Sequence, residues 1–376
     1  MKLTPHSRFG AVALTGVLAL TLAACSSGSS AEPGETTGTG GDAPAELSGS
    51  LAGAGASSQE KAVAGWIAGF NDTYPGVAVS YDAAGSGGGR GQFLAGGVQF
   101  AGSDAPLKPE EVEAAVDRCY GGEALELPLY ISPIAVVYNL PDVDTDNIQL
   151  SAATLAKIFD RQITTWDDPA IAAENPDVTL PSIDIIPVNR NDESGTTENF
   201  TEYLAAASEG AWTHEPSGDW PLSGGQSGKG TQGMIDTVSG AEGAIGYADA
   251  SRAGDLGTVA LKVGDEYVPF SAEAAAKVVD ASPRAEDATD KRLVVELDRT
   301  TTESGAYPLV LISYSIACST YDDESDANNV KAYLTYVASE AGQDRAADPS
   351  VAGSAPISDT LRTEVQAAID SITVAG

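Results

Sequence analysis

The chain has 376 residues, of which 20 are basic and 54 are acidic, so its formal net charge is −34. This balance excludes a nucleic-acid partner, because nucleic-acid recognition depends on lysine and arginine contacts to phosphate groups. It does not exclude a small anion as ligand, since salt screens exposed charges beyond about 8–10 Å whereas backbone dipoles act at contact range.

The first residues are typical of an export signal. Lys2 and Arg8 precede an uncharged stretch, 11–24, that ends in Leu-Ala-Ala before Cys25. The stretch is shorter than the roughly 20 residues that a transmembrane helix needs. A basic start, a short apolar run and a small-residue exit indicate a secretory signal peptide. We therefore expect a signal peptide over 1–24 and a lipid on Cys25, as in a bacterial lipobox; an ordinary secreted protein is the alternative.

The segment that follows has the composition of a linker. Residues 25–47 are mainly Ser, Gly, Thr, Ala, Pro and acidic residues without apolar periodicity. Such a composition predicts a flexible tether. We expect the lipid and this tether to hold the folded part at the outer face of the bacterial cell membrane, and the folded part is long enough for two lobes with separate cores.

Three glycine- and serine-rich segments each follow a predicted strand or turn and open a predicted helix. They are residues 53–58, 85–89 and 192–197. The first N–H groups of a helix have no partner inside it, and the helix dipole adds positive potential there, so helix starts bind small anions. One such start is an ordinary cap. Three of them, together with Asp104 and Arg190, indicate a receptor for one tetrahedral oxyanion.

Apolar spacing predicts the remaining elements in chain order. The first expected elements are a helix over 58–72 with a capping box from Ser57 to Glu60, a strand over 77–81, a helix to 94 and a strand from 100 to Asp104. The next are an apolar crossing over 125–138, a helix over 151–159, a strand over 183–188 and a turn at 190–197 that opens a helix. The last are a second crossing over 307–317 and helices over 331–341 and 358–372.

Strands that alternate with helices predict an α/β fold, and two crossings predict two lobes with a hinge between them. We expect lobe I to comprise residues 48–131 and 308–376, and lobe II to comprise residues 132–307. Cys119 and Cys318 remain after export. In an exported chain such a pair is more often a disulfide than two thiols, although both states stay open.

The order of these motifs resembles the PstS family, the phosphate-binding lipoproteins of bacterial ABC phosphate importers. The matching segments are 53–57, 85–88, 101–107, 166–171, 194–196, 228–230 and 243–247. The resemblance implies a class II periplasmic-binding-protein fold, in which two lobes, each a mixed sheet flanked by helices, close on one phosphate ion. It also implies a monomer that has an ABC permease as its partner, with no cofactor and no metal.

The same resemblance assigns the phosphate ligands. They are Ser57, Ser58, Ser86, Asp104, Arg190, Ser194, Gly195 and Thr196. Asp104 would accept a hydrogen bond from protonated phosphate and repel sulfate, which carries no proton near neutral pH. Arg190 would pair with phosphate oxygens through its planar guanidinium. Glu193 stands where the family usually has glycine, and its carboxylate would weaken anion binding unless the side chain points outward.

Two other functions stay open. The first is a binding protein for another tetrahedral oxyanion, such as sulfate or molybdate, which Asp104 disfavours. The second is a surface phosphatase or other hydrolase with Ser194 or Ser86 as nucleophile. That enzyme would need a base or metal ligands, and His214 is the single histidine left after export. Taken alone, Ser57 could also be a helix cap, and Arg190 could be an ion pair with Asp192.

Overall fold

A computed structural model describes residues 47–376, so the predicted signal peptide, Cys25 and the tether up to residue 46 lie outside the described residues. The central sheet is mixed, with the strand order β2-β1-β3-β11-β4-β8-β6-β7, and β5, β9 and β10 attach to it beside β4. None of the helices within 47–376 has the length and apolar character needed to cross a membrane.

The first lobe is built on one end of this sheet. Its strands are β1 (Gly49–Gly55), β2 (Val77–Asp82) and β3 (Phe100–Ser103), and β1 pairs in parallel with both neighbours. Its helices are α1 (Glu60–Thr73), α2 (Ser86–Leu94), α3 (Pro109–Arg118), α9 (Glu324–Ala338), α10 (Glu340–Ala347) and α11 (Asp359–Asp370). A short pair of strands, β12 (Thr320–Tyr321) and β13 (Thr373–Val374), lies beside α9.

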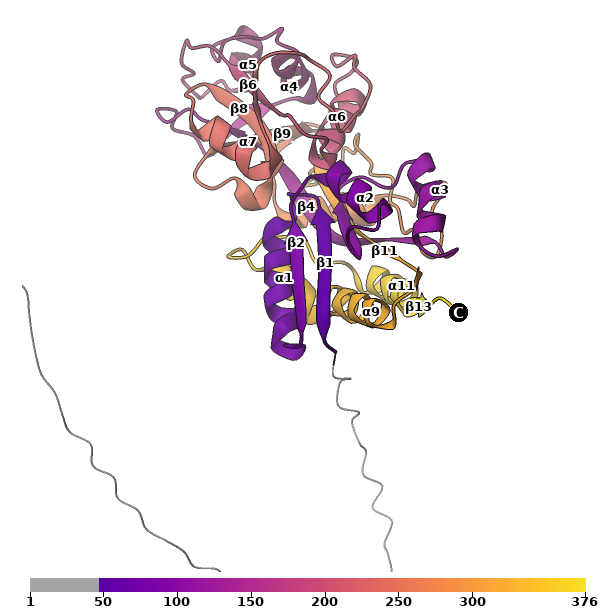
Figure 1. The fold of residues 1–376 in the computed structure, drawn as a ribbon. Coiled ribbons are helices and arrows are strands. Elements are labelled where there is room, and N and C mark those ends of the chain that lie inside the picture. The colour runs from indigo at the N-terminus through magenta and orange to yellow at the C-terminus, as the bar shows by residue number, and fades with distance from the viewer. Residues whose placement is uncertain (1–46) are drawn as a thin grey trace, which may run out of the picture. The chain divides into compact units, whose positions relative to one another are not determined.

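The second lobe is built on the other end. Its strands are β5 (Asn147–Leu150), β6 (Ile186–Arg190), β7 (Gln226–Gly228), β8 (Ala244–Asp249), β9 (Gly257–Val263) and β10 (Glu266–Val268). Its helices are α4 (Ala152–Phe159), α5 (Pro169–Glu174), α6 (Gly195–Ala207), α7 (Gly230–Ser239), the 3-10 turn η1 (Ala250–Arg252) and α8 (Ala272–Ala281). Figure 1 shows this lobe above the first one.

Two long strands connect the lobes. β4 (Ala124–Tyr138) pairs with β11 (Val310–Cys318) as far as Pro133, and from Ile134 it pairs with β8. Every residue of both strands is buried. The near-continuous apolar sequence of these strands therefore reflects burial on both faces of the sheet. The predicted α/β fold with two lobes is confirmed.

Two elements differ from their predicted bounds. The predicted strand over 183–188 is shifted, because residues 183–185 bond to the segment 164–166 and the regular strand β6 ends at Arg190. The predicted helix over 331–341 begins earlier, at Glu324, because the carboxylate of Asp323 caps it by accepting the N–H of Asp326 at 3.0 Å. Arg190 therefore lies at the end of a strand, where ligands of α/β proteins bind.

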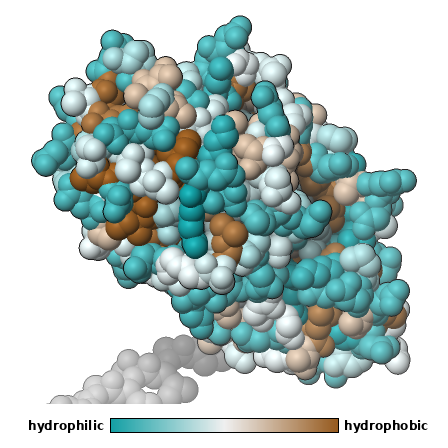
Figure 2. Space-filling view, turned by 90° about the horizontal axis from the view of Figure 1, so that it is seen from above, coloured by the Kyte–Doolittle hydropathy of each residue, from teal (hydrophilic) through white to brown (hydrophobic). Residues whose placement is uncertain are grey.

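The surface is largely hydrophilic. Figure 2, which views the molecule from above, shows polar side chains over most of that face with apolar patches between them. Within the described residues, the large apolar side chains that are exposed are Val116, Tyr120 and Val374.

The two cysteines of the described chain form a disulfide inside the first lobe. Cys119 follows α3 and Cys318 ends β11; their Cα atoms are 5.1 Å apart, and 199 positions of sequence separate them. Both residues are fully buried. The bond fastens the end of α3 to the strand that crosses into the second lobe.

The double variant Cys119→Ser/Cys318→Ser should unfold at lower urea concentration than the wild type. A loop of this length carries a closure entropy worth about 4–5 kcal/mol in the unfolded chain. Urea unfolding followed by circular dichroism measures the loss, with the reduced and oxidised wild type as matched controls. A loss below about 1 kcal/mol would contradict a stabilising role for the disulfide.

Candidate functional site

A buried carboxylate lies at the junction of the two lobes. Asp104 directly follows β3, and only 3% of its surface is exposed. Its Oδ1 accepts the hydroxyl of Ser58 at 2.6 Å, and its Oδ2 accepts the hydroxyl of Thr196 at 2.9 Å. Ser58 belongs to the first lobe and Thr196 to the first turn of α6 in the second lobe. The two lobes therefore meet on this one side chain.

The starts of α2 and α6 pack against Asp104 closely. The hydroxyl of Ser86, the first residue of α2, accepts the N–H of Asp104 at 3.2 Å. A Cβ added at Gly195 would lie 2.7 Å from both the Cβ of Asp104 and the Oγ of Ser86. One turn farther along α6, the amide of Asn199 donates to the carbonyl of Asp104 at 2.7 Å. Because real Cβ atoms do not approach so closely, this contact requires glycine at position 195.

Ser57 joins the first lobe to the start of α7. Its hydroxyl accepts the N–H of Thr231 at 3.0 Å and lies 3.0 Å from the hydroxyl of the same residue. The predicted capping box of Ser57 and Glu60 is therefore wrong: α1 begins at Glu60 after Gln59, and no side chain caps it. The Ser57 hydroxyl bonds Thr231 of the other lobe and makes no hydrogen bond to the start of its own helix, α1.

Arg190 is buried beside this junction and forms two hydrogen bonds to one carboxylate. Its Nε donates to Oδ1 of Asp192 at 2.8 Å and its Nη2 to Oδ2 at 2.5 Å. Asp192 also accepts the N–H of Gly230, the first residue of α7, at 3.1 Å. Burial alone would raise the pKa of Asp192, but the hydrogen bonds and charge of Arg190 outweigh burial and lower it. The pair therefore stays charged inside the protein.

Burial raises the pKa of Asp104 above its ordinary value. Hydrogen bonds from Ser58 and Thr196 and the positive charge of Arg190 act in the opposite direction without cancelling the effect of burial. Asp104 and Arg190 are both only 3% exposed, so each charged side chain has little contact with solvent.

Ser194 caps α6. Its hydroxyl accepts the N–H of Thr197 at 3.2 Å, and the hydroxyl of Thr197 bonds that of Tyr247 at 2.8 Å. Direct contacts thus connect five of the residues that the sequence singled out: Ser58, Ser86, Asp104, Gly195 and Thr196. Ser57 and Arg190 reach the start of α7 through Thr231 and Asp192, and Ser194 precedes Gly195 in the chain.

The start of α7 overlaps the end of the family-like segment 228–230, but none of its residues was among the expected ligands. Gly230 and Thr231 bond Asp192 and Ser57, which makes this a fourth helix start at the lobe junction. The available signal was the pair of glycines at 228 and 230 before an amphipathic stretch, the same pattern as in the other three segments. Asn199 and Tyr247 also lie at the junction; Tyr247 ends the family-like segment 243–247, whereas nothing in the sequence context of Asn199 distinguishes it from a core residue.

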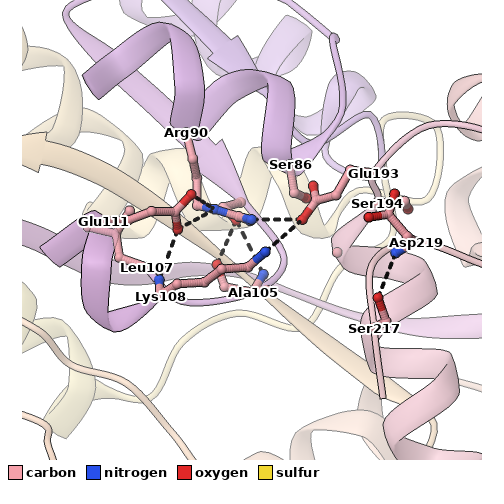
Figure 3. Close-up of polar contacts among 12 residues, drawn as sticks. Ser86, Arg90, Ala105, Leu107, Lys108, Glu111, Glu193, Ser194, Ser217 and Asp219 are labelled. Atoms are coloured by element: carbon pink, nitrogen blue, oxygen red, sulfur yellow. Dashed lines mark hydrogen bonds and ion pairs between the residues drawn. The ribbon is translucent and has the colours of Figure 1, made fainter. Parts of the chain in front are cut away.

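Glu193, next to Ser194, turns its side chain toward the first lobe. Its Oε1 accepts Nη2 of Arg90 at 2.8 Å and lies 3.9 Å from Nζ of Lys108. Figure 3 shows the two cations approaching this carboxylate from one side, with Ser86 and Ser194 near it. None of the hydrogen bonds to Asp104 or Arg190 involves Glu193. The side chain thus makes its contacts with the cations of the first lobe.

The described residues hold no cluster of three or more His, Cys, Asp or Glu side chains arranged for a metal ion. His214, the one histidine in the described part of the chain, lies 2.9 Å from Oδ1 of Asp160. Its ring packs edge-on against Trp212. These contacts place its ring among second-lobe residues, and it makes no hydrogen bond to Ser86 or Ser194.

Comparisons with known proteins identify the family of this chain. Residues 38–341 match the model of the PBP superfamily domain. The Mycobacterium tuberculosis protein named phosphate-binding protein PstS 3 is 34% identical over 97% of this chain and 99% of its own length. The chain belongs to the PstS family of phosphate-binding proteins. The Haemophilus influenzae phosphate-binding protein PstS is 31% identical over 82% of this chain and 90% of that protein.

Solved structures share the fold. PfluDING, a periplasmic phosphate-binding protein bound with phosphate, has a TM-score of 0.68 at 18% identity, covering 85% of this chain and 93% of its own. A human phosphate-binding apolipoprotein has a TM-score of 0.65 at 19% identity, covering 84% and 93%. At these identities the similarity shows the two-lobed fold alone.

Glu198, in the first turn of α6, provides a test of the electrostatics of this region. Burial and the charge of Glu202 raise its pKa from 4.5 to about 7. A carboxyl group whose pKa is raised on folding stabilises the fold fully below pH 4.5, and this contribution is lost as the pH rises to about 7. Glu198→Gln should therefore stabilise the protein at pH 8, by at most about 3 kcal/mol.

Thermal unfolding at pH 5 and at pH 8 measures this difference. The variant should gain stability at pH 8 and gain much less at pH 5. Glu113→Gln, which changes an exposed acid on α3, is the matched control and should show no such dependence. Equal shifts for Glu198→Gln at both pH values would contradict a raised pKa.

Proposed function

We propose that this protein captures inorganic phosphate between its two lobes outside the cytoplasm and delivers it to an ABC-type permease. The observation that carries the proposal is Asp104, a buried carboxylate held by one hydroxyl from each lobe. The names of the PstS relatives and the phosphate bound to PfluDING support the same ligand.

The proposed ligand groups divide into donors and one acceptor. The donors are Ser57, Ser58, Ser86, Arg190, Ser194, Gly195 and Thr196, all of them buried. The hydroxyl of Ser58 already bonds Asp104, so we assign its backbone N–H to the ligand. Ser57 accepts the N–H of Thr231, and we assign its own proton to the ligand, with the Thr231 hydroxyl as the donor in their 3.0 Å contact. Charge-assisted hydrogen bonds contribute about 1.5–3 kcal/mol each, so six or more offset the cost of desolvation.

Asp104 is the proposed acceptor and the source of selectivity. Phosphate near neutral pH carries at least one O–H, whereas sulfate carries none, so an ionised carboxylate bonds the first and repels the second. A site built around a ligand O–H can reject an analogue without it by about 10⁴–10⁵. Because burial raises the pKa of Asp104, this selectivity should weaken in acid sooner than it would for an ordinary aspartate.

We place the hinge where β4 passes from the first lobe to the second. We assign residues 48–131 and 308–376 to lobe I and residues 132–307 to lobe II. The change of partner along β4, from β11 to β8 between Pro133 and Ile134, supports these bounds. The segment before β11 supplies the return crossing.

We also propose how the protein is held and how it works. The signal peptide over 1–24 is removed, a lipid on Cys25 anchors the chain to the outer face of the cell membrane, and residues 25–47 tether it. The protein acts as a monomeric binding protein and not as an enzyme. The hydrogen bond between His214 and Asp160 supports this view, since that histidine makes no bond to Ser86 or Ser194, the serines considered as nucleophiles.

Asp104→Asn should narrow the gap between phosphate and sulfate affinities by at least tenfold. The amide can donate to sulfate and no longer carries the charge that repels it, while phosphate loses an ionised acceptor. Calorimetric titration with each anion measures the change, and Asp117→Asn, an exposed position on α3, is the control. Unchanged selectivity would remove Asp104 from the site. Absence of phosphate binding by the wild type would refute the proposed function.

Arg190→Met should weaken phosphate binding by about 2–4 kcal/mol, because it removes the guanidinium donors and leaves the partly buried Asp192 carboxylate without its cation. The double variant Arg190→Met/Asp192→Asn removes that charge as well. It should recover part of the loss and stay at least tenfold weaker than the wild type. Recovery of full affinity in the double variant would assign Arg190 to a structural ion pair only.

A further inference from the structure

One ionic contact between the lobes shares no hydrogen bond with the proposed phosphate ligands. Glu193 extends from the segment between β6 and α6 in the second lobe to Arg90 on α2 and Lys108 before α3 in the first lobe. The distances to Oε1 of Glu193 are 2.8 Å from Arg90 and 3.9 Å from Lys108. Figure 3 shows the two cations converging on this carboxylate. We call these three residues the clasp.

The cation at the centre of the clasp is fixed by its own lobe. The Arg90 side chain is only 1% exposed. Its Nε donates to both carboxylate oxygens of Glu111 at 2.9 and 3.1 Å, and its Nη1 donates to Ser103 at 3.0 Å. These partners leave Nη2 directed at the second lobe. The Arg90 side chain is therefore held in the same conformation whether or not it contacts Glu193. Little side-chain entropy is lost when the contact forms.

The chain leaves room for Glu193 at two glycines. A Cβ added at Gly87 would lie 2.0 Å from Oε2 of Glu193, and one added at Gly218 would lie 3.0 Å from Oε1. Oε2 is buried and has no hydrogen-bond partner among the described residues. Gly87 belongs to the first turn of α2, where the helix dipole favours a negative charge. The carboxylate thus lies against the first turn of α2, in space that side chains at Gly87 and Gly218 would fill.

We propose that the clasp stabilises the closed form of the protein and thereby raises phosphate affinity and slows phosphate release. The inference rests on the proposed phosphate-binding function. A ligand that binds the closed form has an affinity proportional to the closed fraction, so a contact made only on closure strengthens binding without touching the ligand. Glu193 therefore acts opposite to the weakening expected of an extra acid beside an anion site.

A second cross-lobe ion pair provides an internal comparison. Arg252 of η1 pairs with Glu60 of α1 at 2.7 Å, but the Glu60 side chain is 46% exposed against 23% for Glu193. Exposed pairs contribute little because water and salt screen them. The clasp, with a buried arginine at its centre, is the stronger of the two contacts.

The first test measures phosphate affinity and the phosphate release rate at low and high salt. Glu193→Gln should weaken affinity about three- to tenfold, mainly through faster release, and should reduce the salt dependence of affinity. Lys108→Gln should act in the same direction with a smaller effect, because its Nζ is 3.9 Å away and its side chain is 49% exposed. Glu110→Gln, an exposed acid beside Glu111, is the control. Unchanged or tighter binding in Glu193→Gln would overturn the proposal.

The second test uses phosphate-free protein, so it does not depend on ligand binding. Small-angle X-ray scattering should give a larger radius of gyration for Glu193→Gln than for the wild type and Glu110→Gln, because the open fraction rises. Equal radii for all three proteins would refute the clasp, even if phosphate binds. Failure of the wild type to bind phosphate would refute the proposed function, while this comparison would still decide the clasp.

Discussion

The structure depends on keeping one carboxylate, Asp104, buried where two lobes meet. An isolated carboxylate is costly to bury, so the surroundings must supply donors or positive charge. Here a serine from the first lobe and a threonine from the second lobe donate to separate oxygens, and Arg190 contributes its charge. The same requirement brings together the starts of α2, α6 and α7, since their first residues provide hydroxyls and N–H groups at one place.

The central strands make this convergence possible. β4 and β11 are buried along their whole length, and β4 exchanges one partner for another as it passes from the first lobe to the second. The segments that follow β1, β3 and β6 then contact one another at the lobe junction. The strongly acidic composition does not conflict with an anion site, because the far field of surface charges is screened and the near field comes from helix starts and Arg190.

Much of this could be predicted from the sequence, and the failures have identifiable causes. Periodicity located the crossings at β4 and β11, and the glycine- and serine-rich segments located three of the four helix starts. The role of Ser57 was predicted only in part, because a capping box is a local pattern whereas the partner of Ser57 lies 174 positions away. Arg90 and Lys108 gave no signal, since nothing in a sequence shows which surface of a helix another lobe will cover.

Gly195 has a consequence for how far the lobes can approach each other. Its missing side chain lets the backbone of α6 lie directly against Asp104 and Ser86, where even a methyl group would come 2.7 Å from both. The contact of the α6 backbone with the Cβ of Asp104 and the Oγ of Ser86 therefore limits how near the two lobes can lie at this point. In the proposed phosphate site, such a contact keeps the donors of the two lobes at a constant separation, which favours an ion of one size.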